Sequence, residues 1–186
     1  MDNGASSYRR FLDGNDKGIE EIVKTYKDGL ILYLNGFVNN IHTAEDLAED
    51  TFFRLMVKKP HFSGKSLFKS FLYAIGRNIA IDWIRHNSKT FTVTSEEMEI
   101  YLSDETELEQ AYIREEHKLI LHRALKKIPI DYRQAIWLVY FEDMSNDEAA
   151  RAMKKSSRQI RNLLYRGKQS LKRELEKEGF IYEELG

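Results

Sequence analysis

The chain has 186 residues, with 29 Lys and Arg against 30 Asp and Glu, so its formal net charge is −1 at pH 7. It contains no cysteine, which excludes disulfides, thiolate nucleophiles and cysteine-ligated zinc and is compatible with a reducing cytoplasm. Its apolar runs are too short to cross a bilayer and the first residues lack a signal-peptide pattern, so we expect a cytoplasmic protein without membrane insertion.

The first half of the chain contains three predicted helical segments. Apolar residues at three- and four-residue steps predict one or two amphipathic helices over residues 17–40. Thr43 and Asp46 have the spacing of a capping pair and predict the start of a second helix, which should end before Pro60. The expected inner face of that helix is Leu47, Thr51, Phe52, Leu55 and Met56. A third helix is expected over residues 67–86, with an inner face formed by Phe71, Leu72, Ile75, Ile79 and either Trp83 or Ile84.

Composition changes in the second half of the chain. Residues 88–105 lose helical periodicity within an acidic stretch, which predicts a linker. Helices are expected over 106–127 and 146–153, each starting at a capping box, with a short apolar helix over 131–141 and a final helix over 157–178. We therefore predict an all-α protein with two small helical domains and a flexible acidic linker, divided as 1–87, 88–105 and 106–178 with a tail at 179–186.

The last two predicted helices have the arrangement of a helix-turn-helix. Residues 154–173 carry eight Lys or Arg and no Asp or Glu, and Ile160, Leu163, Leu164 and Leu171 give the final helix an apolar face. A solvated charged face is the alternative, but such faces usually mix both signs. Cationic and amide side chains instead suit phosphates and base edges. The residues predicted to contact duplex DNA are Lys154, Lys155, Ser156, Ser157, Arg158, Gln159, Arg161, Asn162, Tyr165, Arg166 and Lys168.

A second basic tract and an acidic helix lie in the first half. Residues 54–89 hold eight Lys or Arg and one acid, interleaved with aromatic residues, a combination that suits single-stranded nucleic acid. The alternative is that these aromatic residues are core. Asp46 and Asp50 are neighbours one helical turn apart that repel each other, which favours a basic protein partner. The helix dipole offers another explanation for Asp46, but a weaker one for Asp50.

These residues together resemble a family. The stretch from Ala44 to Phe52, AEDLAEDTF, and the stretch from Ser70 to Arg85, SFLYAIGRNIAIDWIR, are similar to the core of bacterial RNA polymerase sigma factors. The C-terminal half resembles the promoter-binding helix-turn-helix of the same family. Two such domains with a short linker are typical of its extracytoplasmic-function group. The chain departs from the family pattern at Glu49, Phe71, Ala149, Lys155 and Gly167, where Gln, Trp, Ile, an apolar residue and Ala are usual.

The resemblance implies a separate binding function for each of the two domains. The first would bind the clamp helices of the polymerase largest subunit through Asp46, Glu49, Asp50 and Phe53. It would also bind the −10 element, with the 61–66 loop accepting an extruded base; these residues are His61, Phe62, Ser63, Gly64, Lys65, Ser66, Arg77, Asn78 and Arg85. The second domain would read the −35 element and contact the polymerase flap. An anti-sigma factor is a further partner that the resemblance allows.

An enzyme and a stand-alone DNA-binding regulator are the two alternatives to a sigma factor. Ser63 to Ser66 imitates the end of a phosphate-binding loop, but Lys59 stands where the required glycine should be, and no strand precedes it. His117 and His122 do not have the spacing of a helical metal pair. We therefore expect no enzyme activity, cofactor, metal or small-molecule substrate. The main alternative is a stand-alone helix-turn-helix regulator, which would bind duplex DNA without polymerase.

Overall fold

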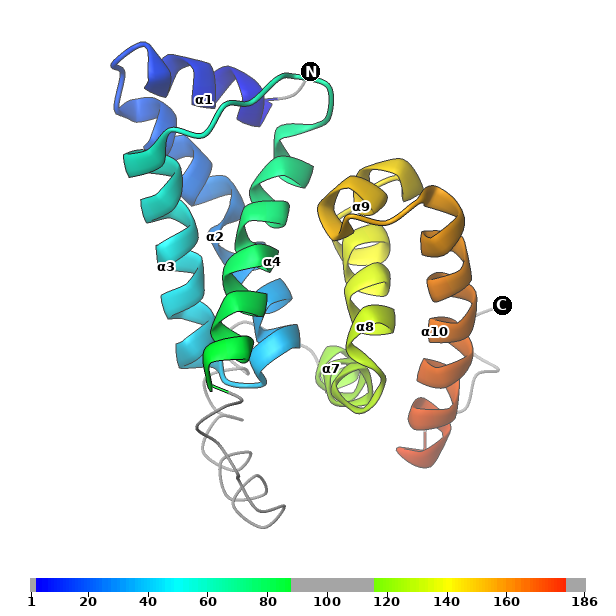
Figure 1. Ribbon diagram of the computed structural model, residues 1–186. Helices are drawn as coiled ribbons and strands as arrows, with labels where there is room; N and C mark the ends of the chain where they lie inside the picture. Colours follow the sequence, from blue (N-terminus) through cyan, green and yellow to red (C-terminus); the bar gives the residue numbers. More distant parts are fainter. Residues whose placement is uncertain (1–2, 88–115, 180–186) are drawn as a thin grey trace.

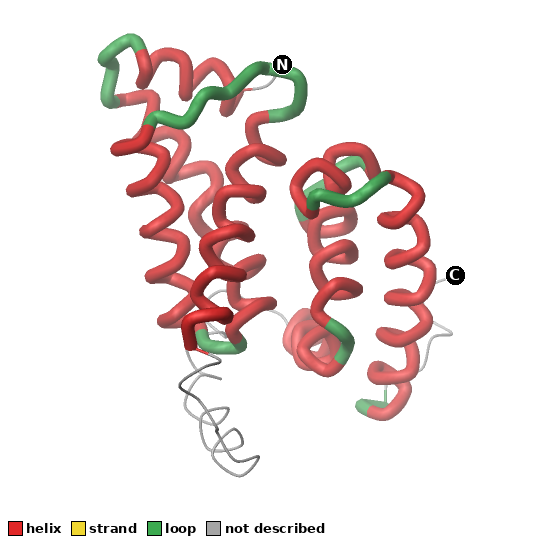
Figure 2. Tube along the Cα trace, in the orientation of Figure 1, coloured by secondary structure: helices red, strands yellow, loops and turns green. Residues whose placement is uncertain are grey.

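The computed structural model describes residues 3–87 and 116–179, and Figure 2 shows that every regular element in these ranges is helical. The first four helices are α1 (Asn3–Leu12), α2 (Lys17–Val38), α3 (Ile41–Lys58) and α4 (Phe68–Asn87). They are followed by α7 (Glu116–Lys127), α8 (Ile130–Ile136), the π-helical turn η1 (Trp137–Phe141), α9 (Asn146–Met153) and α10 (Ser157–Lys177). The all-α prediction is confirmed. The predicted linker 88–105, the expected helix start at residue 106 and most of the tail lie outside the described residues.

Helices α2, α3 and α4 pack against one another and α1 lies across one end of them (Figure 1). The prediction that Thr43 caps α3 was wrong, because the cap is Asn40, whose side-chain oxygen accepts a hydrogen bond of 2.7 Å from the Thr43 amide. Asn39, with φ of 50°, turns the chain between α2 and α3 in the left-handed conformation that Asn tolerates. Together these two Asn residues end one helix and start the next within two positions.

Helix α1 was not predicted. Its buried face consists of Gly4, Ser7, Tyr8 and Phe11. Because two of these residues are Gly and Ser, the apolar periodicity of the helix is weak in the sequence. The Tyr8 hydroxyl donates to the Pro60 carbonyl oxygen at 2.8 Å. One predicted core position was wrong, because Met56 is 36% exposed. Of the two alternatives at the end of α4, Ile84 packs against the core and Trp83 is 37% exposed.

Helices α8, α9 and α10 form a second packed group with α7 beneath it (Figure 1). Its core includes Ile160 and Leu171, as the apolar pattern predicted, together with Leu138 and Ala149. The packing explains why residue 167 is Gly, because a Cβ at this position would lie 3.0 Å from Ile136 Cδ1 and 3.1 Å from Tyr132 Cβ. Glycine therefore permits the close crossing of α10 over α8. Across residues 3–87 and 116–179, no helix is long and apolar enough to cross a membrane.

The two helical groups touch through α4 with α9 and α2 with α8. Arg133, in α8, is 8% exposed and donates across this contact to the Gly36 carbonyl oxygen at 2.6 Å and to Asn39 Oδ1 at 3.1 Å. The same guanidinium donates within its own group to the carbonyl oxygens of Ile128, at 3.1 Å, and Lys126. Burial lowers the pKa of Arg133 to about 10. The buried Arg133 side chain therefore links α8 to the C-terminal end of α2 by hydrogen bonds.

Candidate nucleic-acid interface

The helix-turn-helix is built from two consecutive capping boxes. The Glu148 amide donates to Ser145 Oγ at 3.3 Å while Glu148 Oε2 accepts from the Ser145 amide at 2.7 Å, which starts α9. Lys154, with φ of 54°, ends α9 in the left-handed conformation. Ser156 then starts α10 by the same reciprocal exchange, with Gln159. These local bonds fix where the last helix begins and satisfy backbone donors at its first turn.

The outer face of α10 is an exposed stripe of polar and cationic side chains. Four exposed residues, each three or four positions from another, lie opposite the buried Ile160: Arg158, Arg161, Asn162 and Tyr165. Tyr165 is 67% exposed. Arg166 lies beside this stripe and is exposed as well. Guanidinium and amide groups on one face of a helix are suited to base edges and phosphates in a major groove.

Other residues predicted to contact DNA make bonds within the protein. Lys155 Nζ lies 3.1 Å from Asp131 Oδ2 in α8, and Ser157 Oγ donates to Asp147 Oδ1 in α9. The side-chain oxygen of Gln159 is used in the capping box, although the residue is exposed. The Lys168 ammonium lies 4.6 Å from the centre of the Tyr140 ring. The prediction thus mixed residues of the outer stripe with residues that position α10.

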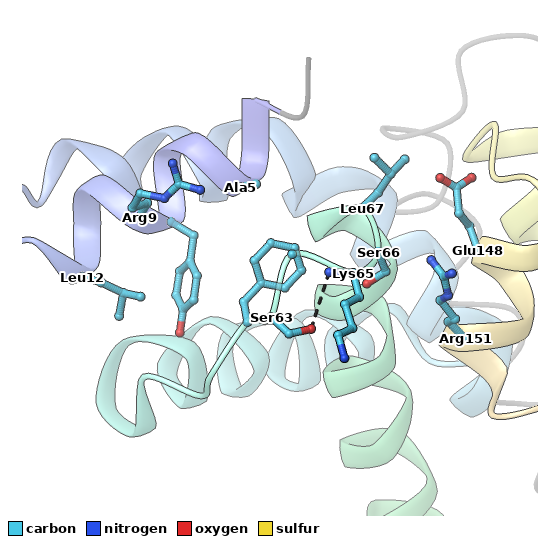
Figure 3. A pocket seen from close by; sticks show the side chains of 12 residues that line it. Ala5, Arg9, Leu12, Ser63, Lys65, Ser66, Leu67, Glu148 and Arg151 are labelled. Atoms are coloured by element: carbon cyan, nitrogen blue, oxygen red, sulfur yellow. Dashed lines mark hydrogen bonds between the residues drawn. The ribbon is translucent and has the colours of Figure 1, made fainter.

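The 61–66 loop forms one wall of a cavity of about 540 Å³, shown in Figure 3. Phe62 is the anchor of the loop, because its ring packs 5.1 Å from the Phe71 ring and 5.6 Å from the Phe68 ring. Gly64, with φ of 72°, turns the loop back toward α4. The predicted residues that line the cavity are Phe62, Ser63, Gly64, Lys65 and Ser66. His61 is exposed but does not line it.

Sequence reasoning missed three groups of residues around this cavity. Helix α1 contributes Arg9 and Leu12, which no motif indicated because the helix itself was not predicted. Leu67 follows the loop directly. Glu148 and Arg151 reach the same cavity from α9, more than 80 positions along the chain (Figure 3). Only the folded chain brings these groups together.

The predicted DNA-contacting residues of α4 have different surroundings. Arg77 is partly buried and its Nε donates to Gln134 Oε1 in α8 at 3.1 Å. Asn78 is partly buried as well. Arg85 is exposed near the end of the helix, 3.8 Å from Asp82 Oδ1. The structure therefore does not bring these three residues into one open surface.

The predicted protein-binding face of α3 is an exposed stripe. Asp46, Glu49, Asp50 and Phe53 follow helical spacing and all are exposed, with Phe53 60% exposed. Its apolar end continues into Met56 and Val57, which were not predicted as part of it. Glu49, Asp50 and Phe53 also line a groove of about 430 Å³ between α2 and α3. We call this surface, Asp46 to Val57, the α3 stripe; it offers carboxylates and apolar side chains side by side.

Two family models match the chain, in the order of its two helical groups. The model for Sigma-70 region 2 matches residues 22–90, and the model for Sigma-70, region 4 matches residues 118–171. Among residues 3–87 and 116–179, no group of three or more His, Asp or Glu side chains is placed to hold a metal ion.

Two curated relatives come from Bacillus subtilis (strain 168). The ECF RNA polymerase sigma factor SigM is 27% identical over 154 residues, which cover 83% of this chain and 93% of SigM. The ECF RNA polymerase sigma factor SigW is 26% identical over 170 residues, which cover 87% of this chain and 91% of SigW.

Two solved structures have the same fold. One is the sigma factor RpoE of Bartonella quintana in complex with the anti-sigma factor NepR, with a TM-score of 0.67, 18% identity and coverage of 86% of this chain and 98% of RpoE. The other is CnrH in complex with the cytosolic domain of CnrY, with a TM-score of 0.64, 19% identity and coverage of 94% of this chain and 96% of CnrH.

Proposed function

Because this chain belongs to the extracytoplasmic-function group of the sigma-70 family, we propose that it binds core RNA polymerase and directs it to promoters with particular −10 and −35 elements. The observation that carries the proposal is the presence of two exposed stripes of different chemistry, on α3 and on α10. We place the protein in the cytoplasm, where polymerase and promoter DNA are found. Sigma factors are not a class of enzyme.

We assign the α3 stripe to the polymerase. Carboxylates next to Phe53, Met56 and Val57 suit a helical partner that carries basic residues around an apolar strip. The clamp helices of the largest subunit are the proposed partner, and the flap is the proposed partner of the second domain. By analogy with the two solved complexes, an anti-sigma factor is an additional proposed partner.

We assign the cavity beside the 61–66 loop to the −10 element. An extruded base needs a pocket with polar groups at its edge and an apolar wall, and here Ser63, Lys65 and Ser66 are the polar groups and Phe62 and Leu12 the apolar ones. The division into a first domain at 1–87, a linker at 88–105, a second domain at 106–178 and a tail at 179–186 is part of the same proposal.

We assign the outer stripe of α10 to the −35 element. Arg158, Arg161 and Asn162 lie in the first turns of the helix, which is the part of a recognition helix that contacts base edges. Arg166 lies farther along and is the proposed phosphate contact. Lys155 and Ser157 would then act on DNA only indirectly, by holding α10 against α8 and α9.

The test is transcription with purified core polymerase. Templates are chosen by mapping transcript starts after overexpression, and the chain should direct initiation at those starts while core alone does not. Asp46→Lys with Asp50→Lys should lower co-purification with core, because it reverses the charge of the α3 stripe. Asp13→Lys with Asp28→Lys, at exposed sites outside the stripe, is a control pair of equal charge change. Duplex binding by the free chain, with no dependence on core, would instead indicate a stand-alone regulator.

A further inference from the structure

The cavity beside the 61–66 loop is preformed, because contacts on both sides of the loop fix its position. The Tyr8 hydroxyl of α1 donates to the Pro60 carbonyl oxygen just before the loop, and the Tyr8 ring lies 5.2 Å from the Phe68 ring just after it. Phe62, inside the loop, also packs on Phe68, with ring centres 5.6 Å apart. A ligand can therefore enter the cavity without first ordering the loop, which lowers the cost of binding.

Three cationic side chains from three different elements surround the cavity. They are Arg9 of α1, Lys65 of the loop and Arg151 of α9, and all three are exposed (Figure 3). In the part of the chain that the structure describes, none of them is paired with a carboxylate. Among the described residues that line the cavity, Glu148 alone is acidic, and its Oε2 already accepts from the Ser145 amide at 2.7 Å. The lining therefore carries three positive charges against one negative charge.

Cations nearby in the sequence but outside the cavity are paired. Arg10, the next residue of α1, pairs with Glu21 of α2. Lys69, at the start of α4, lies 2.6 Å from the carboxylate of Glu142, which follows η1. Cations that surround a common space repel one another, and an anion between them removes that repulsion. The contrast between the two sets indicates that the cavity is a site for an anion from outside the chain.

The other lining groups indicate which kind of anion fits. The hydroxyls of Ser63 and Ser66 add hydrogen-bond donors, and guanidinium, ammonium and hydroxyl donors together suit phosphate groups. Leu12, Phe62 and Leu67 supply an apolar and aromatic surface, which a phosphate alone does not need. The volume of about 540 Å³ lies within the range of small-molecule sites, about 300–1,000 Å³. A ligand with several phosphates and one flat ring system uses both kinds of surface.

We propose that this cavity binds a free nucleotide that carries two or more phosphate groups. Arg9, Lys65 and Arg151 bind the phosphates, and the base lies on Phe62 and Leu67. A ligand that reaches all three cations has to fit between the two helical groups, because Arg151 belongs to the second one, and this favours a small molecule over a promoter strand. The nucleotide shares the loop with the proposed −10 contact and would compete with promoter DNA there. Only this competition rests on the proposed function.

Isothermal titration calorimetry of the full chain in magnesium-free buffer tests the site. ATP and GTP are the probes, and AMP, adenosine and inorganic pyrophosphate are the comparison ligands. At least one triphosphate should bind at one site per chain, at least about tenfold more tightly than AMP, because its additional phosphates reach more of the cations. Pyrophosphate should also bind at least about tenfold more weakly than that triphosphate, because it has no base to place on Phe62. Adenosine, which has no phosphate, should show no binding.

Charge-removing variants locate the site. Arg9→Gln in α1 and Arg151→Gln in α9 should each weaken binding of the triphosphate at least about tenfold, since each removes a charge-assisted hydrogen bond. Arg54→Gln and Arg173→Gln are the controls, because both are exposed, lie outside the cavity and change the charge equally. They should leave the affinity within about twofold, since salt screens distant surface charges. Circular dichroism should show equal helical content in all four variants.

The outcomes separate this inference from the proposed function. Triphosphate binding that is lost in Arg9→Gln and Arg151→Gln and kept in the controls supports the site. The site is overturned if neither ATP nor GTP binds, if pyrophosphate or AMP binds as tightly as the triphosphate, or if the controls weaken binding as much as the cavity variants do. The last result would indicate a general attraction of anions to the chain. Calorimetry uses neither polymerase nor DNA, so a chain that directs no transcription would contradict the proposed function and leave this test intact.

Discussion

Replacing Arg133 by Met should destabilise the folded chain by about 3 kcal/mol. Met fills much of the space of the aliphatic stem but removes donors to the carbonyl oxygens of Gly36, Lys126 and Ile128 and to Asn39 Oδ1. A buried acceptor without a partner costs about 1–3 kcal/mol. The lower end of that range is appropriate for each of the three carbonyls, because removing the buried guanidinium also relieves a desolvation cost of several kcal/mol.

Urea unfolding followed by helical circular dichroism measures this loss. Asn39→Gly separates the bond between domains from the bonds inside the second domain, because glycine keeps the left-handed turn at φ of 50° and loses only the side chain. It should cost about 1 kcal/mol, the usual net contribution of one hydrogen bond. Arg173→Met, at an exposed site, is the control and should stay within about 0.5 kcal/mol of the parent. A loss below about 1 kcal/mol for Arg133→Met would refute the reasoning, since it would mean that water replaces the guanidinium freely.

Three further outcomes are expected. Gly167→Ala should lower the free energy of unfolding by about 1 kcal/mol, because overpacking of about 1–3 kcal/mol exceeds the gain in helix propensity of up to ~1 kcal/mol; thermal unfolding measures it. Arg158→Ala should cost about 1–3 kcal/mol on the best −35 sequence and relax one position, whereas Arg166→Ala should weaken all sequences alike and lower the salt slope by about one unit; holoenzyme binding across salt and −35 variants measures both. Burial raises the pKa of Tyr33 and, together with the nearby Glu142 carboxylate, that of Tyr73, so both hydroxyls stay protonated in the folded chain. Stability should be fully present below about pH 10 and fall as the pH rises further, and in an absorbance titration these two should ionise only on unfolding.

The sequence was most informative where the deciding interactions are local. The capping box at Ser145 joins residues three positions apart, so the start of α9 could be predicted from spacing alone. The box at Ser156, which starts α10, is equally local, although it was not part of the prediction. Helix α1 was missed because two partners of its buried Tyr8, the Pro60 carbonyl oxygen and the Phe68 ring, lie more than 50 positions away. Its own residues carry little periodic signal.

The roles of individual basic residues could not be separated for the same reason. Lys155 and Arg158 look equivalent in the sequence, yet Lys155 pairs with Asp131, a residue of another helix, while Arg158 faces outward. The bond from Arg133 to Gly36 spans 97 positions and follows no motif. Long-range polar contacts depend on how whole helices are placed, and a pattern of charges along one helix does not contain that information.

The glycines of α2 limit how freely the halves of this chain can be exchanged with those of other sigma factors. Hybrid regulators are most easily built if each half is an independent module. Here Gly29 and Gly36 are matched to Glu142 and Arg133 of the other half. A hybrid that combined this α2 with a foreign second half would place unmatched side chains over the two glycines and would lose the close packing between the halves.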